Sequence, residues 1–184
     1  MGCSVYTLSG LTLNCDSNKG GIKTVLIANY DEAAANALNA LVEGVSGATE
    51  IAVSAITAQT GLTWYRYDFK RNTGSMTSTL NVDEAAGTNY VTTEVILQFN
   101  RMETKKRIEM RALSLNELCA IVVDSNNKAW FLGLNEPVVA SAGTGQTGTA
   151  KADGNYYQIT LQANDDTYPF EVNGDISNLP VNNA

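Results

Sequence analysis

A glycine-rich segment in the C-terminal third of the chain has the spacing of a nucleotide-binding fingerprint. Gly143, Gly145 and Gly148 match the pattern GxGxxG. In dinucleotide-binding folds this pattern follows a β-strand and opens a helix, whose N-terminus holds the pyrophosphate. The residues after Gly148 are Thr-Ala-Lys-Ala-Asp-Gly, which are typical of a turn and do not begin a helix. The sequence therefore predicts no dinucleotide site, but a loop over 140–154 that becomes ordered against a neighbouring subunit.

Three clusters of acidic and amide residues have types that occur in metal or catalytic sites. Asp165 and Asp166 could form a pair of carboxylates, whereas 124–126 and 153–155 contain the oxygen ligands that calcium prefers. Neither of the latter two segments continues into an EF-hand loop, which needs a glycine at its sixth position and a terminal glutamate. All three clusters lie among turn-forming residues, so we interpret them as turns and solvated loops.

The chain has no histidine and few cysteines. Histidine is the commonest general base and the commonest metal ligand, so its absence weighs against an enzyme. Cys3, Cys15 and Cys119 are odd in number and widely spaced, which is not typical of a disulfide framework or a zinc site. We therefore predict reduced thiols, no catalytic residue, no metal and no cofactor.

Composition and charge restrict the classes of partner. The 184 residues are 44% hydrophobic and 17% charged, which predicts a packed core beneath a surface that is poor in charge. With 12 basic and 19 acidic residues the net charge is −7, whereas binding to a nucleic-acid backbone needs clustered Lys and Arg. The longest apolar run, 118–123, is too short to cross a membrane, and we see no signal peptide at the N-terminus.

One segment concentrates positive charge in this acidic chain. Its basic residues are Arg101, Lys105, Lys106, Arg107 and Arg111. Two interpretations stand side by side. The cluster could contact an acidic patch on a neighbouring copy, such as Asp83 with Glu84 or Asp165 with Asp166, or it could be a solvated strand face.

Alternating and β-branched segments predict most of the secondary structure as strands. We expect strands over 22–28, 50–56, 64–71, 121–123, 129–132 and 156–161. A long hairpin is expected within 72–100, with arms over 75–82 and 89–100 around the turn 83–87. In the second arm, Val95, Leu97 and Phe99 fall on one face.

Two segments carry helical signals. Residues 31–44 are expected to form a helix that Asp31 caps, with Leu38, Leu41 and Val42 on one side. The segment 105–113 is ambiguous, because a helical stripe and a strand-like alternation of charged and apolar residues overlap in it. We favour a strand there, followed by a short helix that begins at Ser114 with the spacing of a capping box.

These elements predict a mainly β fold, a β-sandwich or barrel with one or two flanking α-helices. We interpret 1–184 as a single domain, because no linker or internal repeat divides it. Within it we expect an N-terminal arm (1–21), the long hairpin (72–100), the loop (140–154) and a C-terminal tail (173–184).

The order of elements over 90–172 resembles that of tail-tube proteins of double-stranded DNA phages, the major tail protein class. The resemblance rests on the strand 95–100, the basic residues 105–107, the hairpin strands within 121–133, the loop 144–149 and the closing strand after Asp153. It is a resemblance of pattern and order, without a diagnostic motif.

The resemblance implies a tail-tube type of fold and a virion structural protein that is assembled in the host cytoplasm. Such subunits form rings, usually hexameric, that stack into a conduit for the genome. Implied partners are other copies of the chain, other tail proteins, and double-stranded DNA that passes through an acidic lumen without specific binding; no membrane is involved. Candidate inter-subunit residues are Arg101, Lys105, Lys106, Arg107, Asp83, Glu84, Gly143, Gly145 and Gly148.

Other functions stay open at this point. The helix over 31–44 has no clear place in the tail-tube pattern, which leaves a ring adaptor, a terminator or another tail component as alternatives. A carbohydrate-binding β-sandwich could use Trp64, Tyr65, Tyr67 and Trp130 to stack on sugars. A hydrolase that works with carboxylates alone would need two of them to converge in one cleft.

Overall fold

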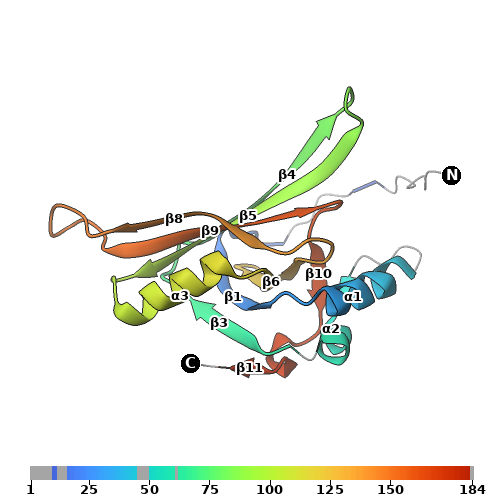
Figure 1. Ribbon diagram of the computed structural model, residues 1–184, viewed down its shortest axis with the longest axis horizontal. Helices are drawn as coiled ribbons and strands as arrows, with labels where there is room; N and C mark the ends of the chain where they lie inside the picture. Colours follow the sequence, from blue (N-terminus) through green and yellow to red (C-terminus); the bar gives the residue numbers. More distant parts are fainter. Residues whose placement is uncertain (1–9, 12–15, 45–49, 61, 183–184) are drawn as a thin grey trace.

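The computed structural model describes residues 10–11, 16–44, 50–60 and 62–182 (Figure 1). Within these ranges the elements are β1 (Ile22–Asn29), α1 (Glu32–Gly44), β2 (Glu50–Ala52), α2 (Val53–Thr60), β3 (Trp64–Asp68), β4 (Ser75–Asp83), β5 (Thr88–Asn100), α3 (Thr104–Leu115), β6 (Leu118–Asp124), β7 (Ala129–Leu132), β8 (Val139–Gln146), β9 (Tyr156–Asp165), β10 (Phe170–Asn173), the 3-10 helix η1 (Ile176–Asn178) and β11 (Val181–Asn182). The prediction of a mainly β fold is confirmed.

The strands form two separate sheets. One has seven strands in the order β11-β3-β1-β6-β7-β10-β2, and the other has four in the order β4-β5-β9-β8. In the part of the chain that the structure describes, an isolated bridge between Leu118 of β6 and Val138 before β8 is the one pairing between the two sheets, so the expectation of a closed barrel is wrong. The described ranges also hold three α-helices, more than the one or two expected.

The seven-stranded sheet is buried on both faces. Along β1, Val25 and Ile27 point into one apolar cluster, while Leu26 and Ala28 point into another. β6 divides its side chains in the same way. Near-continuous apolar runs of this kind are typical of strands that are covered on both sides.

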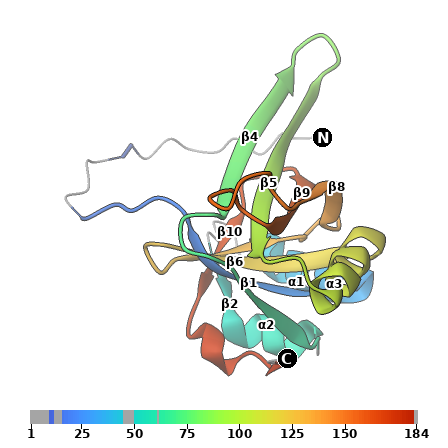
Figure 2. The same ribbon diagram turned by 90° about the vertical axis from the view of Figure 1, so that its left-hand side faces the viewer.

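Different layers cover the two faces. On one side the four-stranded sheet contributes Leu97, Ile159 and Leu161 to the first cluster, all at most 1% exposed. On the other side Leu38 of α1 and Ile56 of α2 enter the second cluster. The molecule is therefore layered, with the seven-stranded sheet between the four-stranded sheet and the α1–α2 pair (Figure 2).

Helix α1 agrees with the prediction. The Oδ1 atom of Asp31 accepts hydrogen bonds from the backbone N–H groups of Ala33 and Ala34, at 2.9 and 3.2 Å. A capping carboxylate of this kind satisfies N–H groups that the first turn leaves without an intrahelical partner. Leu38, from the predicted apolar side, is buried, whereas the side chains of residues 41 and 42 lie outside the described part.

The strand predicted over 50–56 is correct only for its first three residues. β2 pairs in parallel with β10 over Glu50–Ala52, and α2 begins at Val53. Val53 and Ile56 are both buried in the second cluster, three residues apart. That spacing fits one face of a helix, so packing against the sheet overrides the β-branched composition.

The strand predicted over 105–113 and the helix expected from Ser114 are wrong. One helix, α3, covers Thr104–Leu115. Its Met110 and Leu113, three residues apart, pack on the first apolar cluster, while most of the charged residues face outward. Ser114 lies near the C-terminal end of α3 and does not start a helix. Its hydroxyl donates a hydrogen bond to the Arg111 carbonyl. Lys, Arg, Glu and Met are good helix formers, and that preference prevails here over the alternating pattern.

Of the two segments predicted at the ends of the chain, the C-terminal one differs from the expectation. Residues 173–184 were expected to form a tail, but β11 extends the seven-stranded sheet by pairing with β3, and Leu179 is buried. The predicted arm over 1–21 lies mostly outside the described residues. Its last part contacts the β6–β7 turn, where the Lys19 N–H donates to the side-chain oxygen of Asn126 at 2.9 Å.

Candidate assembly surfaces

The two sheets end in strands of very different length. The seven-stranded sheet is bounded by β11 and β2, which have two and three residues. The four-stranded sheet is bounded by β4 and β8, which have nine and eight residues. Among the described residues, the further pairing beside these edges is one isolated bridge between Leu118 of β6 and Val138, which directly precedes β8. Each of these edges leaves a row of backbone N–H and C=O groups available to another chain.

The amino-acid composition of β4 and β8 does little to prevent these edges from pairing with another chain. β4 contains no charged side chain before its last residue, Asp83, and β8 contains none. Neither strand contains proline. Monomeric proteins commonly blunt edge strands with Lys, Pro, a short length or a β-bulge. β4 has none of these devices, and β8 has only the register shift between Ala140 and Ala142.

A groove runs along the inner side of the β8 edge. It has a volume of about 480 Å³, and its walls come from β8 and from α3. Small residues of β8, including Ala142, Gly143 and Gly145, line one side, and Met110 and Arg111 of α3 line the other. An extended segment that added to this edge would have room for its side chains beside α3.

The glycine-rich segment is part of a β-hairpin, so the loop predicted over 140–154 is wrong in its first half. β8 pairs with β9 as far as the residue pair Gln146–Tyr156, and a turn follows in place of a helix. A Cβ atom on Gly145 would lie 2.8 Å from the Tyr157 ring, so side-chain packing explains the glycine there. Gly148 has φ +73°, in the left-handed region that favours glycine. Gly145 and Gly148 serve the hairpin, and no helix begins after them as the fingerprint requires.

The turn between β8 and β9 is held by the chain itself. Asp153 accepts hydrogen bonds from the backbone N–H groups of Thr149 and Ala150, at 2.8 and 2.7 Å. These bonds stabilise the carboxylate and lower the pKa of Asp153. The segment 153–155 is thus a turn, as predicted, in which the carboxylate already has backbone donors.

The β4–β5 hairpin is confirmed, and its tip projects away from the rest of the molecule (Figures 1 and 2). β9 pairs with β5 only as far as Val91, so the last rows of the hairpin have two strands. The core-facing side continues with Leu80, in the last row that β9 reaches, and with Val82 on the overhang; these side chains are 46% and 61% exposed. At the turn, Asp83 accepts hydrogen bonds from the backbone N–H groups of Ala85 and Ala86. Glu84 is exposed beside it.

The basic cluster lies on α3 and the turn before it, not on a strand face. Lys106 folds back on this turn, with its Nζ atom 2.6 Å from the Asn100 carbonyl and 3.3 Å from Glu103. Arg101 has φ +64° and forms an ion pair with Glu103 at 3.3 Å. Lys105 and Arg107 point into solvent, as does Arg111.

The predicted contact residues therefore form two separate groups in one chain. Asp83 and Glu84 lie at the start of β5, whereas the basic residues follow its end. Gly143 belongs to the groove beside α3. The basic cluster and the β8 groove adjoin each other, and the acidic hairpin tip is at the opposite end of the sheet.

Asp165 lies at the end of β9, where its surroundings are less polar than those of a surface carboxylate. Its Oδ1 atom accepts the Asn135 N–H at 3.1 Å. Burial raises the pKa of Asp165 to about 6, and the neighbouring carboxylates of Glu136 and Asp166 add to the rise. Burial and nearby acidic groups, including Glu32, also raise the pKa of Tyr30. Acidic side chains thus gather at this end of the molecule.

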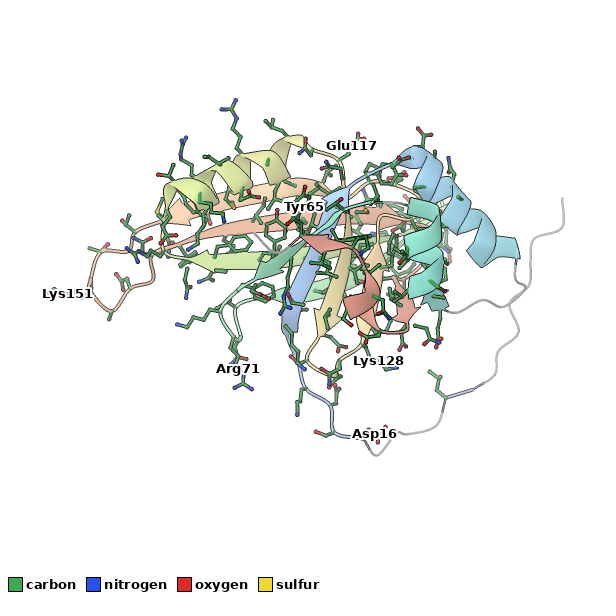
Figure 3. All side chains as sticks on the ribbon, turned by 90° about the horizontal axis from the view of Figure 1, so that it is seen from below. Asp16, Tyr65, Arg71, Glu117, Lys128 and Lys151 are labelled. Carbon is green, nitrogen blue, oxygen red and sulfur yellow. The ribbon has the colours of Figure 1, made fainter. Side chains whose placement is uncertain are left out.

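Opposite charges mark the two ends of α3. Figure 3 shows Lys151 on the loop beside the start of α3 and Glu117 just past the end of the helix. The basic residues of 101–107 lie at the first of these ends, whereas Glu117 is bonded through its carbonyl to the Tyr30 N–H at 2.9 Å. Most of the basic residues of this segment therefore lie near the start of α3.

The four aromatic residues considered for sugar stacking do not form a platform. Trp64 is fully buried and meets Phe131 edge-on, with ring centroids 6.4 Å apart. The Tyr67 hydroxyl donates to Glu109 at 2.9 Å, and burial raises the pKa of that tyrosine. Trp130 is partly buried and donates its indole N–H to Asp124 at 3.3 Å. Tyr65 is the one exposed residue of the four, at 42%.

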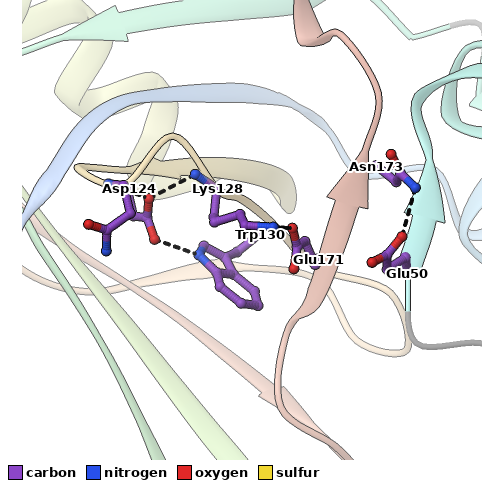
Figure 4. A network of polar contacts seen from close by, with 7 residues as sticks. Glu50, Asp124, Lys128, Trp130, Glu171 and Asn173 are labelled. Carbon is purple, nitrogen blue, oxygen red and sulfur yellow. Dashed lines mark hydrogen bonds and ion pairs between the residues drawn. The ribbon is translucent and has the colours of Figure 1, made fainter. Parts of the chain in front are cut away.

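A network of polar contacts joins β7, β10 and β2 (Figure 4). Lys128 forms an ion pair with Glu171, and the Asn173 side chain donates to Glu50 at 2.7 Å. The Asp124 carboxylate accepts the N–H groups of Asn126 and Lys128, both at 2.8 Å, which confirms the predicted turn. These carboxylates have structural partners in the turn and across strands.

The described residues contain no group of three or more acidic, histidine or cysteine side chains that could hold a metal ion. Cys119 is buried, and burial raises the pKa of its thiol to about 12. The predictions for Cys3 and Cys15 lie outside the described residues. No helix in the described ranges has the length and apolar character needed to cross a membrane.

The comparisons with known proteins returned no relative. Neither models of protein families nor curated proteins nor solved structures match this chain. Sequence reasoning missed the β8 groove, because it depends on α3, which was predicted as a strand. The three-residue spacing of Met110 and Leu113 is the signal that could have indicated the helix.

Proposed function

We propose that this protein is a phage tail structural subunit, which self-assembles into rings through the two open edges of its four-stranded sheet. Stacked rings would form a tube that conducts the genome, in the virion, after assembly in the host cytoplasm. The observation that carries the proposal is the pair of long edges without Lys or Pro on one sheet. In this function the protein is not an enzyme and needs no cofactor.

The strand directions favour a repeating contact. Each neighbouring pair in the order β4-β5-β9-β8 is antiparallel, so β4 and β8 also run in opposite directions. β4 of a second copy could add to β8 of the first and continue the same antiparallel sheet. Because the two surfaces differ, the contact is head-to-tail, and such contacts generate a ring when the rotation closes.

The β8 groove suits the side chains of an added β4 strand. Met76, Leu80 and Val82 lie on the core-facing side of β4, the side on which α3 forms the groove in a neighbouring copy. Burying exposed Leu and Val side chains is favourable by about 25 cal/mol per Å² of apolar surface. Edge pairing would therefore gain apolar burial as well as backbone hydrogen bonds.

The outer face of the four-stranded sheet suits the wall of a DNA conduit. None of the four strands contains Lys or Arg. Side chains that alternate with the core-facing ones are mostly polar and uncharged. Thr77, Glu94 and Gln162, for example, lie in one row across three strands. A surface without cations gives the DNA phosphates no binding site, so DNA could slide past it.

The tail assignment itself rests on the order of elements over 90–172 and on this charge pattern. A ring adaptor or terminator would use the same edges but would not polymerise into a tube. The two assignments differ in the length of the assembled particle, which electron microscopy can measure.

The proposal is tested with a charged β4 edge. We expect the purified wild-type chain to form rings or tubes in negative-stain images and to elute as an oligomer. Thr77→Lys/Thr79→Lys places two charges on the exposed edge strand and should leave a folded monomer. Thr63→Lys/Asn178→Lys adds the same charge at exposed positions away from both edges and should assemble as the wild type does. A wild-type chain that stays monomeric at high concentration would refute the proposal.

A further inference from the structure

We infer that Asp165 is a proton-controlled latch between the two sheets, which closes when its carboxyl group is neutral and loosens when that group is ionised. The inference concerns the single chain and goes beyond the proposed assembly. Its basis is the place of Asp165 in β9, the backbone groups that its carboxylate binds, and the charges that face it.

Asp165 stands at the end of the core-facing row of β9. The side chains two and four residues before it, Ala163 and Leu161, are at most 2% exposed and belong to the first apolar cluster, between the sheets. On β5 it pairs with Val91, which is also buried. Because side chains two residues apart lie on the same face of a strand, the carboxylate of Asp165 is directed toward the seven-stranded sheet.

The carboxylate binds the segment 133–138, which leads from β7 to β8. Its Oδ1 atom accepts the Asn135 N–H at 3.1 Å, and the N–H group of Glu136 acts on the same carboxylate. The Tyr30 hydroxyl, just past the end of β1, donates to the Asn135 carbonyl at 3.4 Å. Side chains that follow strands of both sheets therefore hold one short segment.

The same segment makes the one pairing between the two sheets among the described residues. The Val138 N–H donates to the Leu118 carbonyl at 2.7 Å, and the Leu118 N–H donates to the Val138 carbonyl at 3.0 Å. Both side chains are buried. β8 begins at the next residue, Val139, so the contact between Asp165 and this segment also positions the start of the β8 edge.

The titratable groups that face Asp165 in the described part of the chain are acidic or neutral. Glu136 of the bound segment and Asp166, the next residue, both raise the pKa of Asp165. Tyr30 lies near it at the end of β1, together with Glu32 at the start of α1. The ion pairs within the described residues all lie outside this group. An ionised Asp165 is therefore a partly buried charge whose stabilising partners are backbone N–H groups, and burial of a charge without a counter-ion is unfavourable.

Proton binding changes the balance at the latch. Burial is the largest cause that raises the pKa of Asp165, from an ordinary value of 3.8 to about 6, so the closed latch favours the neutral carboxyl group. The stabilisation is complete below pH 3.8 and is lost as the pH rises to about 6. If opening returns the group to its ordinary pKa, the latch opens about tenfold more often at about pH 7.5 than at about pH 5.

Hydrogen exchange of the full chain at about pH 5 and about pH 7.5 tests the latch, after correction for the chemical exchange rate at each pH. All chains carry the charged β4 edge described above, so that edge pairing does not contribute. We expect the opening equilibrium of the amides in 134–139 to rise about tenfold at the higher pH. Asp165→Asn should remove this rise, because its amide stays neutral and keeps an oxygen that accepts the backbone N–H. The matched control Asp166→Asn removes one charge from the exposed neighbour and should retain most of the rise.

Two other regions of the same chain serve as references. Amides at the centre of β6 report on unfolding of the whole chain, and amides of the β8–β9 turn, at the other end of β9, should show no rise. A rise in 134–139, in amides that exchange faster than the centre of β6, would support the latch. Exchange there that is as slow as in β6, or a rise that Asp165→Asn keeps, would overturn it. A rise that both variants lose equally would also overturn it, because total charge would then be the cause.

Carbon-13 NMR of the Asp165 carboxyl group in the folded parent chain provides a test that needs no variant. A titration midpoint below about pH 4.5 would overturn the latch, since the closed form would then have no preference for the neutral group. None of these outcomes depends on whether rings form, which images of the wild-type chain decide separately.

Discussion

The two sheets of this protein differ in how completely they are covered. The seven-stranded sheet has apolar clusters on both faces, and its edge strands have two and three residues. The four-stranded sheet has one covered face, and its edge strands have nine and eight residues without Pro or Lys. The first sheet therefore satisfies its hydrogen-bonding and apolar surfaces within the chain, whereas the second leaves both kinds of surface for a partner. The difference indicates that the seven-stranded sheet stabilises the monomer, whereas the four-stranded sheet provides the surfaces for assembly.

The largest effect on stability is expected in the seven-stranded sheet. Ile121, in its central strand β6, is fully buried. Ile121→Ala should lower the free energy of unfolding by about 2–5 kcal/mol, because it leaves a cavity in a layer that is packed on both sides. Urea denaturation followed by fluorescence measures this. A loss below about 1 kcal/mol would show that the sheet collapses around the gap and is less closely packed than we describe.

A smaller, pH-dependent effect is expected at the end of the four-stranded sheet. The pKa of Asp165 is raised in the folded state from an ordinary value of 3.8 to about 6, so the folded form disfavours the ionised carboxylate. Its contribution to stability is present below pH 3.8 and is lost as the pH rises to about 6. Asp165→Asn keeps an acceptor for the Asn135 N–H, and should raise the free energy of unfolding at pH 7 by on the order of 1–3 kcal/mol.

The pH profile provides the control for this variant. The difference in the free energy of unfolding between Asp165→Asn and the wild type should be near zero at low pH and should grow between about pH 4 and pH 6. A difference that is constant with pH would mean that the substitution acts through packing. In that case the buried carboxylate of Asp165 would not be a difference between the four-stranded and the seven-stranded sheet.

The third prediction separates stability from assembly. Thr79→Lys, on the exposed outer side of β4, should change the free energy of unfolding of the monomer by less than about 0.5 kcal/mol. Its effect should appear in the oligomer, which we expect to weaken. A clearly destabilised monomer would contradict the division of roles, because it would mean that the β4 edge contributes to the stability of the single chain.

The smallest effect is expected at the ion pair of Lys128 and Glu171 in Figure 4. The lysine is exposed to water, and exposed pairs of this kind contribute little to stability. Lys128→Met should leave the urea midpoint and the oligomeric state unchanged. A marked drop in the midpoint would show that the network across β7, β10 and β2 secures the short edge of the seven-stranded sheet.

The sequence predicted the elements in which local pattern and burial agree. β1 and the hairpin within 72–100 follow from β-branched and alternating residues, and α1 follows from the capping residue Asp31. The sequence patterns failed in α3, where a helical and a strand-like periodicity overlap. The surface that the segment packs against decides between these two periodicities. They also failed for β8, because it is rich in Ala and Gly, which are depleted in strands. Pairing with β9 defines that strand.

The candidate assembly surfaces were predictable only in part. The opposite charges of 83–84 and 101–111 are visible in the sequence, and so are the small residues of 140–148. Which strands form the edges depends on the order β4-β5-β9-β8, which pairs segments that are far apart in the chain. Which side of α3 faces solvent likewise depends on the side that packs inward on the first apolar cluster.

Hydrogen exchange of the backbone amides tests the central claim most directly. The full chain is compared as an assembly and as the Thr77→Lys/Thr79→Lys monomer, with peptides that cover the edges of both sheets. We predict that β4 and β8 gain strong protection in the assembly, while β2 and β11 keep the same exchange in both states. Assemblies that form with no added protection in β4 and β8 would contradict the account.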